Sequence, residues 1–344
     1  MLFILGNLFI IRLSGENMDT TMIYLATNNG LVVAGFQDGW RVIRRSLAGK
    51  HVTSVIAREG VVLAGTTGGV FRSDDDGRSW RDASAGLSQL HIRWLAYHPD
   101  ISDFEFAGTE PAGIFISRDG ANSWREVPEV GDLRDQYHWF LPYSPEAGCV
   151  RGFAFHGPRI YAAVEVGGVL RSDDSGVTWR LAEGSDGTPD LKGPPEPFIY
   201  PDLHSIYVHP SSPDLVFAAT GGDFYRSLDG GNTWKSLYHC YVRAAWIDPD
   251  DPAHLVLGPA DHVETNGRIE ETRDGGSTWR PISNGLDLPW PGHMVERFTQ
   301  VGAELFAILS NGQLFAAPLS HFEWRTILPD VKEVNAVAED GMAG

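Results

Sequence analysis

Three arginines occupy matching positions in three short, related phrases of the sequence: Arg93 in HIRWL, Arg151 in CVRGF and Arg243 in YVRAA. A guanidinium group presents a planar fork of N–H donors that matches the oxygens of a carboxylate, a sulfate or a phosphate. If the fold brings the three side chains together, they can share one anionic ligand. The arginines therefore predict a binding site for a small anion.

Four further phrases, HVTSV, DLHSI, MVERF and EVNAV, align with these three and extend the position into a polar column. An apolar residue precedes the column in all seven phrases. The column consists of Thr53, Arg93, Arg151, His204, Arg243, Glu296 and Asn335. Turns of the same repeats add polar residues that should lean over the same opening, namely Glu110, Glu165 and His262. We predict that these three residues and the three arginines bind the ligand.

Catalysis at such a site would need particular groups. Glycoside hydrolysis uses two carboxylates that flank the bond, whereas lyase chemistry uses a base beside a neutralised uronate carboxylate. The candidate catalytic residues are Glu296, His204 and Tyr241. A second interpretation stays open, in which every arginine of the column pairs with a glutamate and the charges only fill the channel. Those glutamates would be Glu110, Glu165 and Glu296.

Histidines offer a different chemistry, because imidazole is a common ligand of transition metals. Five could collect around the opening: His51, His91, His204, His262 and His293. None has the His-x-His spacing of a tight ligand pair, so we predict no metal and no cofactor, with a metal-dependent enzyme kept as an alternative. Three others recur in YHPD, FHGP and VHPS at the far end of the aligned strands and are predicted to be structural: His98, His156 and His209.

A repeated unit positions these residues. The phrase YRSLDGGNTW at 225–234 returns in related forms along the chain. The related phrases end at Trp80, Trp124, Trp179 and Trp279, and degenerate copies end at Trp40 and Trp324. The spacing of 40 to 55 residues between these tryptophans is close to the length of one four-stranded propeller blade. Within a unit, short apolar runs are cut by Glu-Gly, Thr-Gly-Gly and Asp-Gly turns, and no window has a sustained helical period.

We therefore predict an all-β fold, a seven-bladed β-propeller formed by residues 22–344 as one domain. The first unit, 22–47, lacks the strand that opens the other units, and KEVNAVAED at 332–340 matches that missing strand. The C-terminal strand should pair inside blade 1, which closes the ring and removes its free inner edge.

The repeated phrase itself is predicted to be architecture, a hairpin between the third and fourth strands of a blade. Ser227 and Asp229 can hydrogen-bond to the backbone of the tip, and Gly231 permits a positive φ. Ala121 replaces this glycine in one copy, where we expect strain. The ligand site should then lie at the opposite end of the blades. Two long connections, 125–149 and 180–202, are expected to wall that opening.

The phrase resembles the Asp-box, or BNR repeat, with the pattern Ser/Thr-x-Asp-x-Gly-x-Thr-Trp. This repeat is shared by sialidases, xyloglucan-degrading propeller glycosidases, sortilin-type receptor domains and a photosystem II assembly propeller. The resemblance extends from about Thr21 to the C-terminus and implies a propeller, but those families use one scaffold for unrelated tasks.

Sialidases bind a sugar carboxylate with three arginines, a role that the resemblance would give to the three arginines of the column. The Arg-Ile-Pro motif of sialidases is absent. Their tyrosine–glutamate pair would fall on Tyr241 or Tyr137 with Glu296 or Glu165.

The net charge of the chain limits the kinds of molecule that it is expected to bind. The chain of 344 residues has a formal net charge of −18, which disfavours nucleic acid and anionic membranes. The two cysteines, Cys149 and Cys240, fall two blades apart, so we predict no disulfide between them. Residues 1–21 are expected to be disordered or to precede the true start, since Met18 and Met22 stand just before the first strand. A cytoplasmic location is expected, with secretion left open.

Three functional classes follow. The first is a protein that binds, and by hydrolysis or elimination transforms, an acidic saccharide or another small anion at the channel mouth. The second is a non-enzymatic scaffold or assembly factor that binds protein. The third is the metal-dependent enzyme. We expect a small anionic ligand or saccharide and a possible protein partner, with neither nucleic acid nor membrane.

Overall fold

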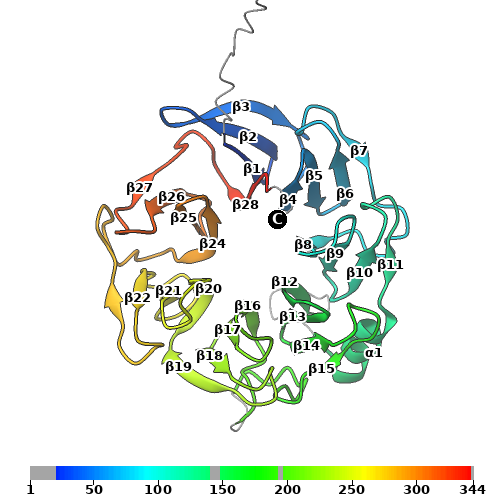
Figure 1. The fold of residues 1–344 in the computed structure, drawn as a ribbon, viewed down its shortest axis with the longest axis vertical. Coiled ribbons are helices and arrows are strands. Elements are labelled where there is room, and N and C mark those ends of the chain that lie inside the picture. Colours follow the sequence, from blue (N-terminus) through cyan, green and yellow to red (C-terminus); the bar gives the residue numbers. More distant parts are fainter. Residues whose placement is uncertain (1–20, 140–147, 193–196, 342–344) are drawn as a thin grey trace, which may run out of the picture.

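Seven four-stranded antiparallel sheets radiate from a central axis in the computed structural model, which describes residues 21–139, 148–192 and 197–341 (Figure 1). The protein is a seven-bladed β-propeller, as its sequence predicts. The predicted extension at 1–21 lies almost entirely outside the described residues. No helix in the described part of the chain is long and apolar enough to cross a membrane.

The strands of each blade follow one another from the axis outwards. Blade 1 contains β28 (Val334–Glu339), β1 (Met22–Thr27), β2 (Gly30–Phe36) and β3 (Trp40–Ser46). Blade 2 contains β4 (Val52–Arg58), β5 (Val61–Thr66), β6 (Gly69–Ser73) and β7 (Arg81–Asp82). Blade 3 contains β8 (Ile92–Tyr97), β9 (Glu105–Thr109), β10 (Ile114–Ser117) and β11 (Arg125–Glu126). Blade 4 contains β12 (Cys149–His156), β13 (Arg159–Glu165), β14 (Gly168–Ser172) and β15 (Arg180–Leu181).

The remaining three blades have the same order. Blade 5 contains β16 (Leu203–Val208), β17 (Val216–Thr220), β18 (Asp223–Ser227) and β19 (Lys235–His239). Blade 6 contains β20 (Tyr241–Ile247), β21 (Leu255–Ala260), β22 (Glu270–Thr272) and β23 (Arg280–Pro281). Blade 7 contains β24 (Val295–Val301), β25 (Glu304–Leu309), β26 (Leu314–Pro318) and β27 (Arg325–Thr326).

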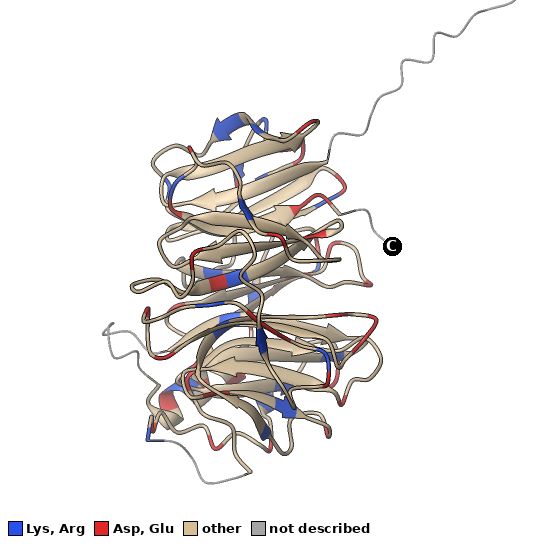
Figure 2. Ribbon diagram, turned by 90° about the vertical axis from the view of Figure 1, so that its left-hand side faces the viewer, with Lys and Arg blue, Asp and Glu red and all other residues tan. Residues whose placement is uncertain are grey.

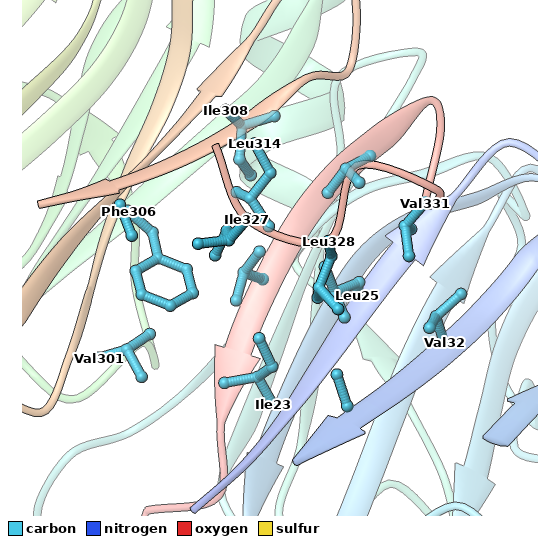
Figure 3. Packing of buried hydrophobic residues seen from close by; sticks show 14 residues of the cluster. Ile23, Leu25, Val32, Val301, Phe306, Ile308, Leu314, Ile327, Leu328 and Val331 are labelled. Carbon is cyan, nitrogen blue, oxygen red and sulfur yellow. The ribbon is translucent and has the colours of Figure 1, made fainter. Parts of the chain in front are cut away.

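The C-terminal strand lies in the first blade, where the sequence places it. β28 pairs antiparallel with β1, with Leu25 opposite Val337 and Tyr24 opposite Ala338. Side chains of β1 and β28 pack with those of blade 7 in one apolar cluster, which includes Leu25, Phe306 and Ile308 (Figure 3). Strands β1 and β28 are thus joined both by a hydrogen-bond ladder and by apolar burial.

The repeated phrases form the predicted hairpin tips. Asp229 accepts hydrogen bonds at Oδ1 from the backbone N–H groups of Asn232 and Thr233, at 3.1 and 2.9 Å, and at Oδ2 from the Thr233 hydroxyl at 2.7 Å. Ser227 Oγ accepts the N–H of Gly231 at 2.8 Å. Ala121, in the copy that lacks this glycine, has a φ of 58°, a left-handed conformation that is costly for an alanine.

One element differs from the expected all-strand pattern. Residues Pro128–Tyr137 form helix α1, whereas the sequence predicts an irregular connection that walls the channel. Pro128 occupies the first turn, where a missing N–H does no harm, and Val130 is buried against the core of blades 3 and 4 with Trp139. Because α1 lies at the outer rim of the ring, this part of the connection does not line the opening (Figure 1). Residues 140–147 lie outside the described residues.

Candidate functional site at the channel mouth

A β-bulge presents the polar column to the channel. In all seven innermost strands, the register shifts at the column residue, so that an extra residue faces the partner strand. In blade 2, for example, Val52 pairs with Thr66 and Ser54 with Gly65, which leaves Thr53 without a partner position. Such bulges re-aim side chains. The polar column in the sequence is therefore a column of bulges in the fold.

A pocket of about 630 Å³ opens at this end of the channel. Its walls include Thr67 and Asn28, which lie in turns between the second and third strands of their blades, so the opening is on the face opposite the Asp-box hairpins. Five members of the column line it: Thr53, Arg93, Arg151, Glu296 and Asn335. His204 and Arg243 are not among its lining residues, and neither are Glu110, Glu165, Tyr241 and His262.

The arginines of the column form ion pairs with glutamates. Arg93 lies 3.1 Å from Glu110. Arg151 lies 3.3 Å from Glu165 in its own blade and 2.6 Å from Glu296, which comes from blade 7 on the far side of the ring. Arg243 contacts the other oxygen of Glu296 at 2.7 Å. These are the pairs that the sequence left open as an alternative, and the carboxylate of Glu296 occupies the space between two arginines.

These pairs determine the ionisation of Glu296. Burial opposes its charge, but the nearby Arg243 and Arg151 outweigh that effect and hold the pKa of this carboxyl well below its usual range. Glu296 is therefore a carboxylate at neutral pH and does not supply a proton to a leaving group. An electrostatic or nucleophilic role is compatible with that state, and its predicted catalytic role stays a prediction.

Arg297, which the sequence analysis missed, also lines the pocket. Its guanidinium lies 4.1 Å from the centre of the Trp94 ring, and no carboxylate of the described residues lies within ion-pair distance of it. Burial lowers the pKa of Arg297 to about 10. The negative charge of Glu296 opposes this shift, and the positive charges of Arg151 and Arg93 add to it. Arg297 remains protonated at neutral pH. In a regular strand the side chains of Arg297 and Glu296 would point to opposite faces. The bulge between Val295 and Arg297 brings both side chains to the channel.

The other two candidate catalytic residues touch each other. The Tyr241 hydroxyl lies 3.3 Å from Nε2 of His204, and Nδ1 of His204 lies 2.8 Å from the carbonyl oxygen of Val242. Burial raises the pKa of Tyr241, which favours the neutral phenol. Arg243 donates to the Tyr241 oxygen at 3.5 Å and so links this pair to Glu296.

The histidines do not gather into one cluster. His51 and His91 line the pocket, whereas the His262 ring lies 6.4 Å from that of Tyr241. Among the described residues, the one group of three or more metal-ligating side chains contains a single histidine, His204, with Glu165 and Asp202.

The histidines predicted to be structural contact turn carbonyls of another blade. Nε2 of His98 lies 3.2 Å from Gly157 O, that of His156 3.1 Å from Pro210 O, and that of His209 3.0 Å from Asp248 O. Both cysteines are free thiols, as expected, and Cys149 donates to Glu165 at 3.0 Å.

Comparisons with known proteins agree on the fold. No family model matches the chain. The oligoxyloglucan-reducing end-specific xyloglucanase of Emericella nidulans is 22% identical over 249 residues, which are 59% of this chain and 29% of that protein. The crystal structure of an ancestral GH74 enzyme superposes with a TM-score of 0.60 at 18% identity, covering 92% of this chain and 40% of that one. The chain spans between 7% and 36% of the length of the curated relatives it matches.

A structure of YCF48 is similar in length to this chain. It has a TM-score of 0.57 at 13% identity and covers 86% of this chain and 88% of its own. Together with the hairpins and the channel mouth, these likenesses define the class as a seven-bladed β-propeller with Asp-box hairpins. The proteins that this chain resembles include xyloglucanases, a GH74 enzyme and YCF48.

Proposed function

We propose that the channel mouth binds a small anionic ligand, with an acidic saccharide as the main candidate. The observation that carries this proposal is Arg297, a half-buried cation that lines the pocket and has no carboxylate of the described residues within ion-pair distance. A buried charge without a partner is costly, and an anion from solution would supply the partner. Arg93 and Arg151 line the same pocket and would extend the cationic wall.

The rest of the pocket suits a saccharide. Polar side chains such as Asn28, Asn335 and Thr53 can exchange hydrogen bonds with hydroxyl groups, and the ring of Trp94 adds an aromatic surface. The xyloglucanase relatives act on a saccharide, as their names state, which supports this ligand class. Elimination or hydrolysis is not part of this proposal, because Tyr241 and His204 lie outside the lining of the pocket and Glu296 is the one candidate catalytic residue that faces it.

The test compares the wild type with Arg297→Leu by calorimetric titration with glucuronate, galacturonate, sialic acid, sulfate and phosphate. We expect at least one of these anions to bind the wild type and Arg297→Leu to weaken that binding by about 10- to 100-fold, because a charge-assisted hydrogen bond is lost. The stability of the ligand-free variant should be unchanged or higher. Arg45→Leu, at an exposed position of β3, is the matched control and should bind like the wild type.

A scaffold that binds protein is the second candidate. YCF48, whose structure was determined with a bound D1 peptide, is a propeller of comparable length. The outer strand β3 exposes Val42 and Ile43 between Arg41 and Arg45. The chain has a net charge of −18, and Figure 2 marks the acidic and basic residues along the ribbon. This function is favoured if no anion binds and if Ile43→Asp loses a protein that co-purifies with the wild type.

A further inference from the structure

We propose that Glu165, Asp202 and His204 form a binding site for a divalent transition-type cation, Zn²⁺ or Mn²⁺, between blades 4 and 5. One ligand atom from each side chain lies within 4.8 Å of the others. Glu165 and His204 are buried, at 4% and 2% exposure, so neither is a casual surface group. This inference is separate from anion binding at Arg297 and does not depend on it.

The inner ends of neighbouring blades place these three side chains next to one another. Glu165 is the last residue of β13, Asp202 directly precedes β16, and His204 is the bulge residue of β16. Gly221 makes room for the carboxylate, because a Cβ atom at this position would lie 2.3 Å from Oδ2 of Asp202. Neighbouring strand ends therefore present three donors to one point.

The histidine is held in the tautomer that a metal needs. A carbonyl oxygen only accepts hydrogen bonds, so the 2.8 Å contact from Nδ1 of His204 to Val242 O puts the proton on Nδ1. The lone pair of Nε2 then faces Oδ1 of Asp202, 3.4 Å away, and the Tyr241 hydroxyl, which can donate to it. Histidine ligands of metals are oriented in this way, with the second nitrogen donating to a carbonyl or a carboxylate.

The distance between Nε2 of His204 and Oδ1 of Asp202 fits two ligands of one metal ion better than it fits a hydrogen bond. N–H···O bonds span about 2.7–3.2 Å, so the 3.4 Å between Nε2 of His204 and Asp202 is too long for a good one. Two ligands at about 2.1 Å from a tetrahedral ion are separated by about 3.4 Å.

The local charge also favours a cation. Among the described residues, no lysine or arginine lies within ion-pair distance of Asp202, whose only such contact is His204. Arg151 offsets part of the charge of Glu165 but is shared with Glu296. The Cys149 thiol donates to Oε2 of Glu165 at 3.0 Å and so helps to orient this ligand. Mixed imidazole and carboxylate donors favour Zn²⁺ or Mn²⁺ over Ca²⁺ and Mg²⁺, which prefer oxygen alone.

The experiment uses the full chain, stripped of metal with a chelator, in a buffer that contains none of the test anions. Zn²⁺, Mn²⁺, Ca²⁺ and Mg²⁺ are titrated separately by calorimetry, and Co²⁺ is added as a spectroscopic probe of the coordination sphere. Asp202→Asn and His204→Gln remove one ligand each. Asp38→Asn and His321→Gln change exposed residues of the same types and are the matched controls.

We expect one equivalent of Zn²⁺ or Mn²⁺ to bind the wild type and both controls. Asp202→Asn and His204→Gln should bind at least 10-fold more weakly, and the Co²⁺ absorption should lose intensity in both. If His204→Gln fails to fold, Asp202→Asn carries the test, because Asp202 is partly exposed. The proposal is overturned if the wild type binds no metal or if Asp202→Asn binds it as the wild type does. Loss of anion binding in Arg297→Leu would leave the metal result unchanged.

Discussion

The two ends of the propeller are both rich in charged and hydroxyl side chains, yet they use them in opposite ways. At the Asp-box face, the same contacts recur in five blades: an aspartate accepts two backbone N–H groups of the tip and a serine or threonine hydroxyl. These aspartates are Asp75, Asp119, Asp174, Asp229 and Asp274, the last with one of the two N–H contacts. At the channel mouth, the residue type at the column position differs between neighbouring blades, except in blades 3 and 4, which both have an arginine.

The difference separates architecture from function. A polar group that is repeated and fully hydrogen-bonded within its own hairpin stabilises that hairpin and leaves nothing for a ligand. The mouth residues instead find partners across the ring, as Arg151 does with Glu296, or, like Arg297, have no carboxylate of the described part of the chain within ion-pair distance. Three changes test this contrast, from the largest expected effect to the smallest.

Glu296→Gln should have the largest effect, because it leaves Arg151 and Arg243 without their shared carboxylate. We expect the free energy of unfolding, measured by urea denaturation, to fall by at most about 3–5 kcal/mol, the loss on breaking a buried pair, because these side chains are 12–22% exposed. A small carboxylate ligand should recover part of this loss, since it can take the place of the missing group.

The control for this change is Glu333→Gln, an exposed glutamate that lines the same pocket. It should change stability by less than about 0.5 kcal/mol. Equal effects of the two substitutions would mean that the cross-ring pairs do not hold the mouth together.

Glu105→Gln tests the Asp-box hairpin of blade 3, in which Ala121 replaces the glycine of the other copies. Oε2 of Glu105 accepts the N–H of Ala121 at 3.1 Å, and burial raises the pKa of Glu105 to about 7, opposed by the Ser117 hydrogen bond. The folded protein therefore holds this proton more tightly than the unfolded chain. Its contribution to stability is present below about pH 4.5 and is lost as the pH rises towards 7.

Glu105→Gln should consequently match the wild type at pH 4.5 and exceed its stability at pH 8 by roughly 3 kcal/mol, since each pKa unit corresponds to about 1.4 kcal/mol. Urea denaturation of both proteins across this range gives the difference. Glu323→Gln, at an exposed position, should follow the wild type at every pH. Parallel curves for Glu105→Gln and the wild type would show that Glu105 has an ordinary pKa.

Asp229→Ala should have the smallest effect of the three. It removes the acceptor of two backbone N–H groups and of the Ser227 and Thr233 hydroxyls in a partly exposed tip, so we expect a loss of about 1–3 kcal/mol. Ligand binding at the mouth should be unchanged, measured by the same calorimetric titration. Leu228→Ala, a neighbour that is 68% exposed, is the control. If folded Asp229→Ala lost ligand binding without losing stability, the Asp-box hairpins would have to be part of the binding site.

The sequence alone determined the blades and the nature of their turns. Tryptophan spacing, strand-length apolar runs and Asp-Gly tips are local signals, because a hairpin is specified by residues a few positions apart. The missing first strand at 22–47 and its match at 332–340 were also readable, since strand patterns can be compared without knowing where they lie. The polar column was visible for the same reason, as one position repeated in seven phrases.

Only the tertiary structure decided how the column is used. Arg151 and Glu296 are 145 residues apart and meet because blades 4 and 7 face each other across the ring, a distance that no local pattern encodes. Arg297 escaped notice because a regular strand alternates its faces, and the bulge at Glu296 breaks that period of two. Asp202 joins Glu165 and His204 because adjacent strand ends converge at the axis. Contacts of this kind depend on the number and placement of the blades, which arise only when the ring has formed.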